Sequence, residues 1–196
     1  MRRHAAAFHA VASAVGFDLQ PDEDLDWLTR HGHLQPTVTS KLPSNALRAI
    51  EAIFAELGGD DEALRAKTRG RMDADFLFQP GSWHVEYDER SHFTTARRAT
   101  FAHYPAAVPL GYDVEAYQEL CELHERRGNK GFAHKTAREF PGPLGRARQR
   151  AYFDAFRDLA AATLHGRPLI RVASPEEDPH VGLERFRACL ALLGIE

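Results

Sequence analysis

The sequence predicts one α/β domain, and three observations support that fold class. The chain has 196 residues, which suits one domain or one domain with an extension. Its 43% hydrophobic and 27% charged residues are ordinary for a globular protein. Two short segments alternate hydrophobic and polar residues, whereas longer segments around them repeat hydrophobic residues at helical spacing. Strands mixed with helices in a chain of this length indicate an α/β domain.

Composition excludes several classes of protein. The two cysteines, Cys121 and Cys189, are too few for a disulfide scaffold or a four-thiolate zinc site, so we expect a reducing compartment. No window approaches 18 continuous apolar residues, so no membrane partner is expected. Residues 5–15 are too weakly apolar for a secretory signal, and we therefore expect a cytoplasmic protein.

Residues 1–43 are predicted to form a helical N-terminal elaboration packed on the core. Residues 3–15 read as a short Ala-rich helix, and residues 22–31 as a second one. The segment 34–43, with two prolines, is predicted to be a connection. A third helix follows at 44–57, where Gly58 and Gly59 end a clear hydrophobic stripe.

Residues 44–196 are predicted to form the core, and a β-hairpin is its most distinctive element. Residues 71–78 and 83–88 both alternate hydrophobic and polar side chains. Gln79-Pro80-Gly81-Ser82 between them has the composition of a turn. The remaining elements are helices at 94–104, 113–127, 149–164 and 183–193 and a short strand at 169–172. We expect a central mixed sheet flanked by helices.

The charges are unevenly distributed although the formal net charge is only −3. Residues 126–150 contain eight basic residues and one acidic residue, together with several glycines and prolines. We read the stretch at about 105–148 as a basic insertion that contacts phosphate groups. The alternative is a solvated loop that balances the acidic stretch at 18–26. Charge alone does not decide between them.

Carboxylates gather on one face of the predicted hairpin. If Phe78 pairs with Trp83, then Asp75 lies opposite Glu86 and Asp73 lies opposite Asp88, because side chains alternate along a strand. Opposed Cβ atoms lie about 4.5–5.5 Å apart, so these like charges repel. A divalent cation removes the repulsion, and Mg²⁺ takes one or two carboxylates plus waters and phosphate oxygens. Mn²⁺ would serve equally.

Three ligands are expected for this metal site, with a fourth group at its margin. Asp75 and Glu86 form the main pair, Asp88 lies next on the same edge, and Glu51 from the preceding helix is an outer ligand. The alternative is a solvated sheet face that nearby cations partly neutralise. A one-residue register slip would also turn one strand's acids away.

The hairpin and the segments after it resemble the PD-(D/E)XK nuclease superfamily, and within it the very-short-patch-repair (Vsr-like) endonucleases. The matching pieces occur in the family's order: Asp75, Glu86, Asp88, His92, Asp154-Ala155-Phe156-Arg157-Asp158 and Leu169-Ile170-Arg171-Val172. The resemblance covers about half the chain. It implies a restriction-endonuclease-like core and hydrolysis of DNA rather than RNA.

Two departures from the family pattern concern catalysis and specificity. The superfamily's usual lysine, two residues past the strand acid, is Asp88 here, so His92 or Arg90 must supply a cation or the cation is missing. A long insertion also separates His92 from Asp154, and it contains the whole basic segment.

Several residues allow two interpretations. His92 is a general base or metal ligand, or a polar residue at the end of a strand. Asp154, Arg157 and Asp158 belong to the site, or they form an ion-pair cluster on the surface of a helix. Arg97 and Arg98 contact phosphate, or they pair with nearby acids.

Taken together, these features predict a metal-dependent endonuclease. We expect the catalytic residues to be Asp75, Glu86, Asp88 and His92. The residues expected to bind nucleic acid are Arg97, Arg98, Lys130, Lys135, Arg138, Arg146, Arg148 and Arg150, with Asp154, Arg157 and Arg171 in support. The alternatives are a catalytically inactive module that binds nucleic acid or protein, and a hydrolase of another phosphate ester. The sequence does not decide between a monomer and a homodimer.

Overall fold

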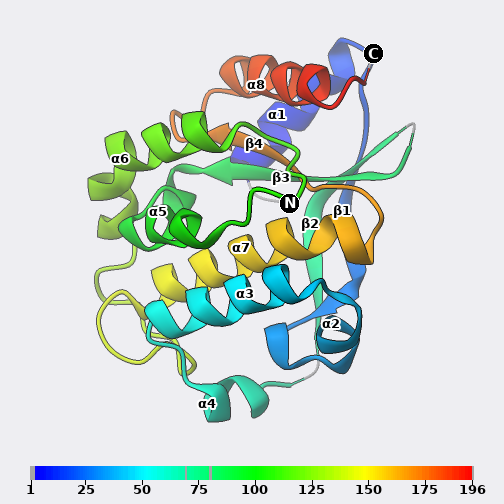
Figure 1. The fold of residues 1–196 in the computed structure, drawn as a ribbon. Coiled ribbons are helices and arrows are strands. Elements are labelled where there is room, and N and C mark those ends of the chain that lie inside the picture. Colours follow the sequence, from blue (N-terminus) through cyan, green and yellow to red (C-terminus); the bar gives the residue numbers. More distant parts are fainter. Residues whose placement is uncertain (1–2, 69, 80, 196) are drawn as a thin grey trace.

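A four-stranded mixed sheet forms the centre of the protein (Figure 1). The structure is a computed structural model that describes residues 3–68, 70–79 and 81–195. The strands lie in the order β1 (Asp18–Thr29), β2 (Arg71–Gln79), β3 (Trp83–Glu89) and β4 (Ile170–Ser174). β1, β2 and β3 are antiparallel neighbours, whereas β3 and β4 are parallel. The predicted α/β fold with a mixed sheet is confirmed at this level.

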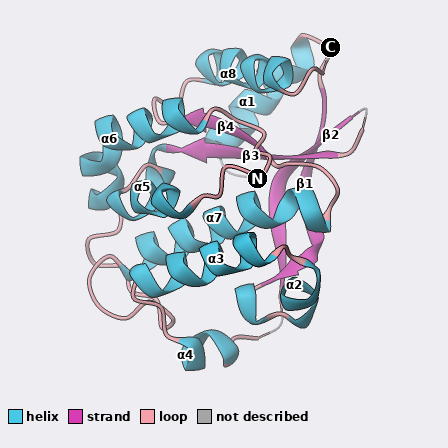
Figure 2. Cartoon of the chain, viewed as in Figure 1, coloured by secondary structure: helices cyan, strands magenta, loops and turns pink. Residues whose placement is uncertain are grey.

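Helices cover both faces of the sheet (Figure 2). α3 and α7 lie side by side on one face, and α1 and α8 contact each other on the other. The helices are α1 (Arg3–Ala14), α2 (Pro36–Lys41), α3 (Ser44–Glu56), α4 (Asp61–Arg65), α5 (Thr95–Thr100), α6 (Val114–Lys130), α7 (Gly145–Leu164) and α8 (Pro179–Leu192). None of these described helices is long and apolar enough to cross a membrane.

Two hydrophobic cores stabilise this arrangement, one under each helical layer. The first joins β1 and β2 to α3 and α7, with Phe54 and Phe156 fully or nearly fully buried. The second joins β2, β3 and β4 to α1 and α8, where Phe8, Tyr87 and Phe186 are buried. Because apolar burial is the main favourable term in folding, these cores fix the sheet between its helices.

The helix expected at 22–31 is wrong. These residues belong mostly to β1, which pairs with β2 and so makes the N-terminal region part of the central sheet. Leu25 is buried, whereas Asp24 and Asp26 on either side are exposed, which is the alternation of a strand. The short segment fits a helix or a strand by pattern, and pairing with β2 decides the outcome.

The hairpin register is as predicted. Phe78 pairs with Trp83, and Phe76 pairs with Val85. Pro80 of the predicted turn lies outside the described residues. Gly81, which follows it, has a φ of 103°, a conformation that glycine adopts without strain.

The basic segment is only partly a loop. Its first residues continue α6 as far as Lys130, and its last ones form the first turns of α7, which begins at Gly145. Irregular turns occupy the stretch between these helices. The expected strand at 169–172 is displaced by one to two residues, to β4.

Candidate active site

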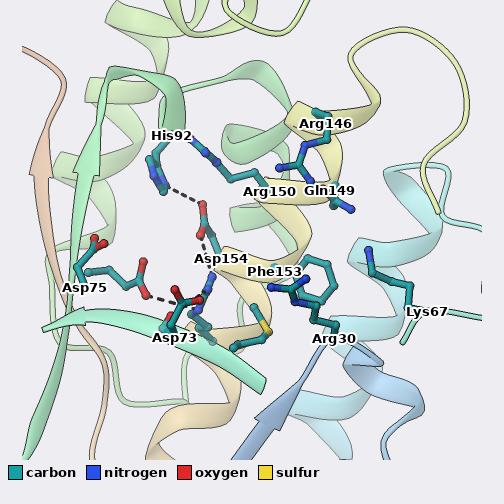
Figure 3. Close-up of a pocket in the computed structure, with 13 residues that line it drawn as sticks. Arg30, Lys67, Asp73, Asp75, His92, Arg146, Gln149, Arg150, Phe153 and Asp154 are labelled. Atoms are coloured by element: carbon teal, nitrogen blue, oxygen red, sulfur yellow. Dashed lines mark hydrogen bonds and ion pairs between the residues drawn. The ribbon is translucent and has the colours of Figure 1, made fainter. Parts of the chain in front are cut away.

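A cavity of about 620 Å³ lies between β2, β3 and α7 (Figure 3). Acidic and basic side chains line it from different sides. The residues around it are Arg30, Lys67, Met72, Asp73, Asp75, Glu86, His92, Arg146, Gln149, Arg150, Phe153, Asp154 and Arg157. The cavity has the volume of an ordinary ligand site, and charged groups dominate its lining.

Asp75 and Glu86 meet in this cavity from paired strands. Asp75 is half-buried, and its Oδ2 accepts a hydrogen bond of 2.9 Å from the Tyr87 backbone N–H. Glu86 is 4% exposed, and its Oε1 accepts no hydrogen bond. Burial raises the pKa of Glu86 to about 7; Arg157 opposes this shift, and Asp75 adds to it. The pair therefore holds negative charge at an electrostatic cost.

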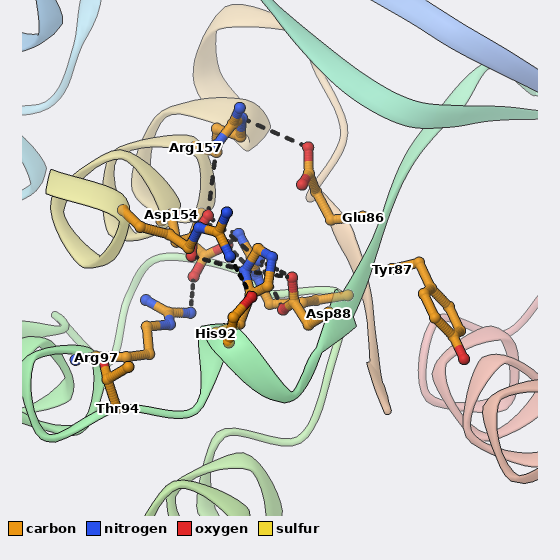
Figure 4. Close-up of polar contacts among 12 residues, drawn as sticks. Glu86, Tyr87, Asp88, His92, Thr94, Arg97, Asp154 and Arg157 are labelled. Carbon is orange, nitrogen blue, oxygen red and sulfur yellow. Dashed lines mark hydrogen bonds and ion pairs between the residues drawn. The ribbon is translucent and has the colours of Figure 1, made fainter. Parts of the chain in front are cut away.

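Arg157 places a guanidinium between Glu86 and Asp154 (Figure 4). Its Nε lies 3.5 Å from Glu86 Oε1, and its Nη1 lies 3.4 Å from Asp154 Oδ1. Its Nη2 donates a hydrogen bond of 3.2 Å to the backbone oxygen of Asp73. Arg157 thus brings a cation to the acids from α7, although no lysine follows Glu86 on β3.

His92 lies between two carboxylates at the edge of the cavity. Its Nδ1 is 2.9 Å from Asp88 Oδ1 and 3.0 Å from Asp154 Oδ2. Burial acts to lower the pKa of His92, but the two carboxylates outweigh it and raise that pKa above its ordinary value. The two carboxylates therefore favour the protonated imidazole, and in that form His92 can donate a proton.

Asp88 does not line the cavity, although it was expected to bind metal. Both of its oxygens accept hydrogen bonds from Arg171, and Tyr117 donates another at 2.7 Å. Burial acts to raise the pKa of Asp88, yet Arg171 and His92 hold it well below its usual range. Over the described residues, β2 pairs with β3 from Phe76 to Phe78, so the expected opposition of Asp73 and Asp88 is wrong. On its other edge β2 pairs with β1, where Asp73 lies opposite Asp24.

A buried ion-pair network extends from Asp88 through Arg171. Arg171 Nη2 lies 2.9 Å from Asp158 Oδ1, and Arg97 Nη2 lies 2.6 Å from the other oxygen of Asp158. Tyr104 and Tyr112 donate further hydrogen bonds to the same carboxylate. The surface-cluster interpretation is therefore wrong for Asp154 and Asp158, which are each 1% exposed.

Arg97 is 0% exposed, so the expectation that it contacts nucleic acid is wrong. The sequence pattern of its short helix carries no sign of this burial. Arg98, the next residue, is exposed and pairs with Glu125 at 2.9 Å, which is the other interpretation offered for it.

Four cations form a second wall of the cavity: Arg30, Lys67, Arg146 and Arg150. Figure 3 shows Arg30, Lys67 and Arg146 on the side away from Asp75 and His92. Lys67 pairs with Glu139, and Arg150 donates a hydrogen bond to the Ser91 hydroxyl. No carboxylate within the described ranges forms an ion pair with Arg30 or Arg146. Their charges are therefore available to an anion.

The other expected nucleic-acid contacts lie outside this cavity. Lys130, Lys135 and Arg138 are exposed beyond its lining. Arg148 has a structural role. Its guanidinium donates hydrogen bonds to the backbone oxygens of Leu57, at 2.9 Å, and of Phe140 and Pro141. Of the eight residues expected to bind nucleic acid, Arg146 and Arg150 thus reach the cavity.

A divalent metal fits Asp75 and Glu86, but no larger cluster supports it. Glu51 is exposed on α3 and does not line the cavity, so it is not placed as an outer ligand. Over the described part of the chain, no three His, Cys, Asp or Glu side chains are grouped to hold a metal ion. Mg²⁺ needs only one or two carboxylates with waters and phosphate oxygens. The Glu86 oxygen without a hydrogen bond suits such an ion.

Sequence reasoning named Asp73 among the acids but missed five other lining residues: Arg30, Lys67, Met72, Gln149 and Phe153. Arg30 and Lys67 lie outside the basic segment and come from chain stretches before β2. No local pattern marks them, because their place in the cavity depends on how β1 and β2 pack against α7. Gln149 and Phe153 repeat at helical spacing with Asp154 and Arg157, which is the one signal that could have indicated a shared helix face.

Comparison with known proteins identifies a family match without a function. Residues 52–141 match the model of a family of unknown function, DUF7255. The matched stretch contains β2, β3 and His92, and it ends before α7, which carries Asp154 and Arg157. No curated protein and no solved structure matches the chain.

Proposed function

We propose that the protein is a metal-dependent nuclease that hydrolyses phosphodiester bonds. One observation carries this proposal: Asp75 and Glu86 share a cavity with Arg30 and Arg146, two cations that form no ion pair with a carboxylate in the described part of the chain. Carboxylates suit a divalent ion, and arginines suit the phosphate groups of the substrate. The resemblance to PD-(D/E)XK nucleases, with a restriction-endonuclease-like core, favours DNA as the substrate.

Asp75 and Glu86 are the residues that would hold Mg²⁺ or Mn²⁺. When bound, the ion would polarise the phosphate and promote ionisation of the attacking water. Ion binding would also remove the repulsion between the two carboxylates, which contributes to the raised pKa of Glu86. Asp88 is not assigned as a ligand, because Arg171, Tyr117 and His92 already engage it.

His92 is assigned the role of proton donor. In hydrolysis, water adds to phosphorus while the bond from phosphorus to the leaving oxygen breaks, and that oxygen needs a proton. His92 lines the cavity, and the carboxylates of Asp88 and Asp154 beside it favour its protonated form. Its proton would pass to the leaving oxygen. Arg157, whose guanidinium touches the acidic wall, would neutralise charge that develops on the phosphate.

A second candidate function is binding without catalysis. The specific observation in its favour is the ion pair of Arg157 with Glu86, which lowers the net charge of the acidic wall without a metal. In that case the cavity would bind nucleic acid as a nuclease-like module that has lost its chemistry.

Cleavage assays separate the two candidates. Plasmid and single-stranded DNA are incubated with the full chain and Mg²⁺ or Mn²⁺, and wild type is compared with Glu86→Gln. Cleavage that requires both the metal and Glu86 is expected. Arg126→Ala is a matched control, because this exposed residue lies on α6 away from the cavity. Cleavage that survives in Glu86→Gln, or the absence of cleavage under every condition, contradicts the proposed activity.

A further inference from the structure

The size of the cavity limits the shape of the substrate. The cavity has a volume of about 620 Å³ and opens to solvent, so its volume limits only the part of a nucleic acid that enters it. Cavities of this volume hold molecules of drug size, which is comparable to a short stretch of one nucleic-acid strand.

The acidic groups are placed so that the phosphate must enter the cavity. Glu86 is 4% exposed and Asp154 is 1% exposed. A duplex resting across the opening would therefore keep its phosphates away from these oxygens. A single strand has no paired strand that holds it outside the cavity, and its backbone can bend inward.

The second wall supplies a place for a neighbouring phosphate. Arg30 and Arg146 are exposed and form no ion pair with any carboxylate in the described ranges. They face the cavity whose other side carries Asp75 and His92 (Figure 3). An adjacent phosphate of the same strand would lie between these guanidinium groups.

Between the two walls the lining contains an aromatic residue. Phe153 lines the cavity, and Lys67 Nζ lies 5.7 Å from the centre of its ring. Proteins that bind single strands combine cations along the backbone with aromatic side chains next to the bases. Phe153 is mostly buried, so it offers a base a ring edge and only limited stacking.

From these observations we infer that the substrate enters the cavity as a single strand, with one phosphate at Asp75 and Glu86 and a neighbouring phosphate at Arg30 and Arg146. This inference rests on the proposed function, because it places the reacting phosphate at the acidic wall. It differs from that function in excluding continuous duplex as the preferred substrate.

Binding measurements test the inference separately from catalysis. Fluorescence anisotropy is recorded for labelled 12-nucleotide single-stranded DNA, single-stranded RNA of the same sequence and the blunt DNA duplex. The protein is the full wild-type chain in Ca²⁺ in place of Mg²⁺, because Ca²⁺ also binds carboxylates and the probe is not exposed to turnover in Mg²⁺. We expect at least one single strand to bind about tenfold more tightly than the duplex.

A double substitution tests the second wall. Arg30→Ala with Arg146→Ala is expected to weaken single-strand binding about tenfold and to flatten its salt dependence by about 1.4 in the slope of log K against log[KCl]. The matched control is Arg126→Ala with Arg127→Ala, which removes the same charge from the exposed face of α6. The control should change neither quantity by as much as half. All four arginines are exposed, so the thermal unfolding temperature of both double variants should equal that of wild type.

Each outcome is decisive. Duplex bound as tightly as both single strands, no binding of any probe, or equal effects of the two double substitutions overturns the inference. If single strands bind as expected but wild type shows no metal-dependent cleavage, the proposed nuclease activity fails and the single-strand site stands.

Discussion

Glu86 and Asp88 lie two residues apart on the same strand, yet their surroundings are opposite. Asp88 is fully buried and accepts hydrogen bonds from Arg171 and Tyr117, with His92 at 2.9 Å. Glu86 has an Arg157 ion pair at 3.5 Å and one oxygen without a hydrogen bond. The pKa of Asp88 is accordingly lowered, and that of Glu86 is raised. A carboxylate whose charge several close partners compensate supports structure, whereas one that Arg157 compensates only in part can take a ligand.

The largest effect is expected when the buried ion pairs of Arg171 with Asp88 and Asp158 are removed. Arg171→Met should lower the free energy of unfolding by about 3–5 kcal/mol, because Asp88 and Asp158 lose their buried partner. Urea denaturation followed by circular dichroism measures this change. A loss below about 1 kcal/mol would show that water or rearranged side chains replace the guanidinium. The surroundings of Asp88 and Glu86 would then not differ in their effect on stability.

The next largest effect concerns Glu86, whose charge is compensated only in part. Glu86→Gln should reduce metal-dependent cleavage about 1,000-fold, which corresponds to ~4 kcal/mol of transition-state stabilisation. It should not lower the free energy of unfolding, because it removes a buried charge. Asp88→Asn on the same strand is the matched comparison, and it should destabilise the protein. If both variants destabilise equally, Glu86 is a structural residue.

His92 connects the two regions and provides a smaller effect. His92→Gln should slow cleavage about 100-fold through loss of the proton donor. In wild type the rate should rise as Glu86 ionises near pH 7 and fall again above the raised pKa of His92. The variant should lose the decline at high pH. If the rate of the variant still falls at high pH, a group other than His92 donates the proton to the leaving oxygen.

The stability of the protein should depend on pH through Glu86. The folded protein holds a proton on Glu86 up to about pH 7, whereas the unfolded chain releases it near its ordinary value of 4.5. Stability from this group is therefore present below pH 4.5 and is lost as the pH rises through 7, by on the order of 3 kcal/mol.

Thermal unfolding at pH 5 and pH 8 measures that loss. Glu86→Gln should be more stable than wild type at pH 8 and nearly equal to it at pH 5. Mn²⁺ should stabilise wild type at pH 8 and leave the variant unchanged. A variant that is less stable at both values shows that Arg157 already compensates Glu86 in the folded state.

The smallest effect comes from a surface pair. Arg98→Ala should change the free energy of unfolding by less than about 1 kcal/mol, because Arg98 itself is exposed and its ion pair with Glu125 is only partly buried. Chemical denaturation should barely distinguish this variant from wild type. A larger loss, close to that of Arg171→Met, would mean that burial is not what separates the two kinds of ion pair.

The sequence by itself determined the hairpin and its register, because alternation along a strand is a local property. It also determined that Asp75 and Glu86 share one face. Tertiary structure decided the rest. Whether residues 18–29 form a helix or a strand depended on the neighbouring strand β2. Likewise, Arg97 is buried because Asp158 and three tyrosines surround it, and the carboxylate that pairs with its charge lies 61 residues further along the chain.

The same reason explains the two walls of the cavity. Arg30 and Arg146 are separated by more than a hundred residues, and only the packing of β1 and β2 against α7 brings them to one opening. Charge counts along the chain report how many cations are present. Charge counts do not show which cations form ion pairs with carboxylates, because ion pairing depends on which side chains the fold brings together.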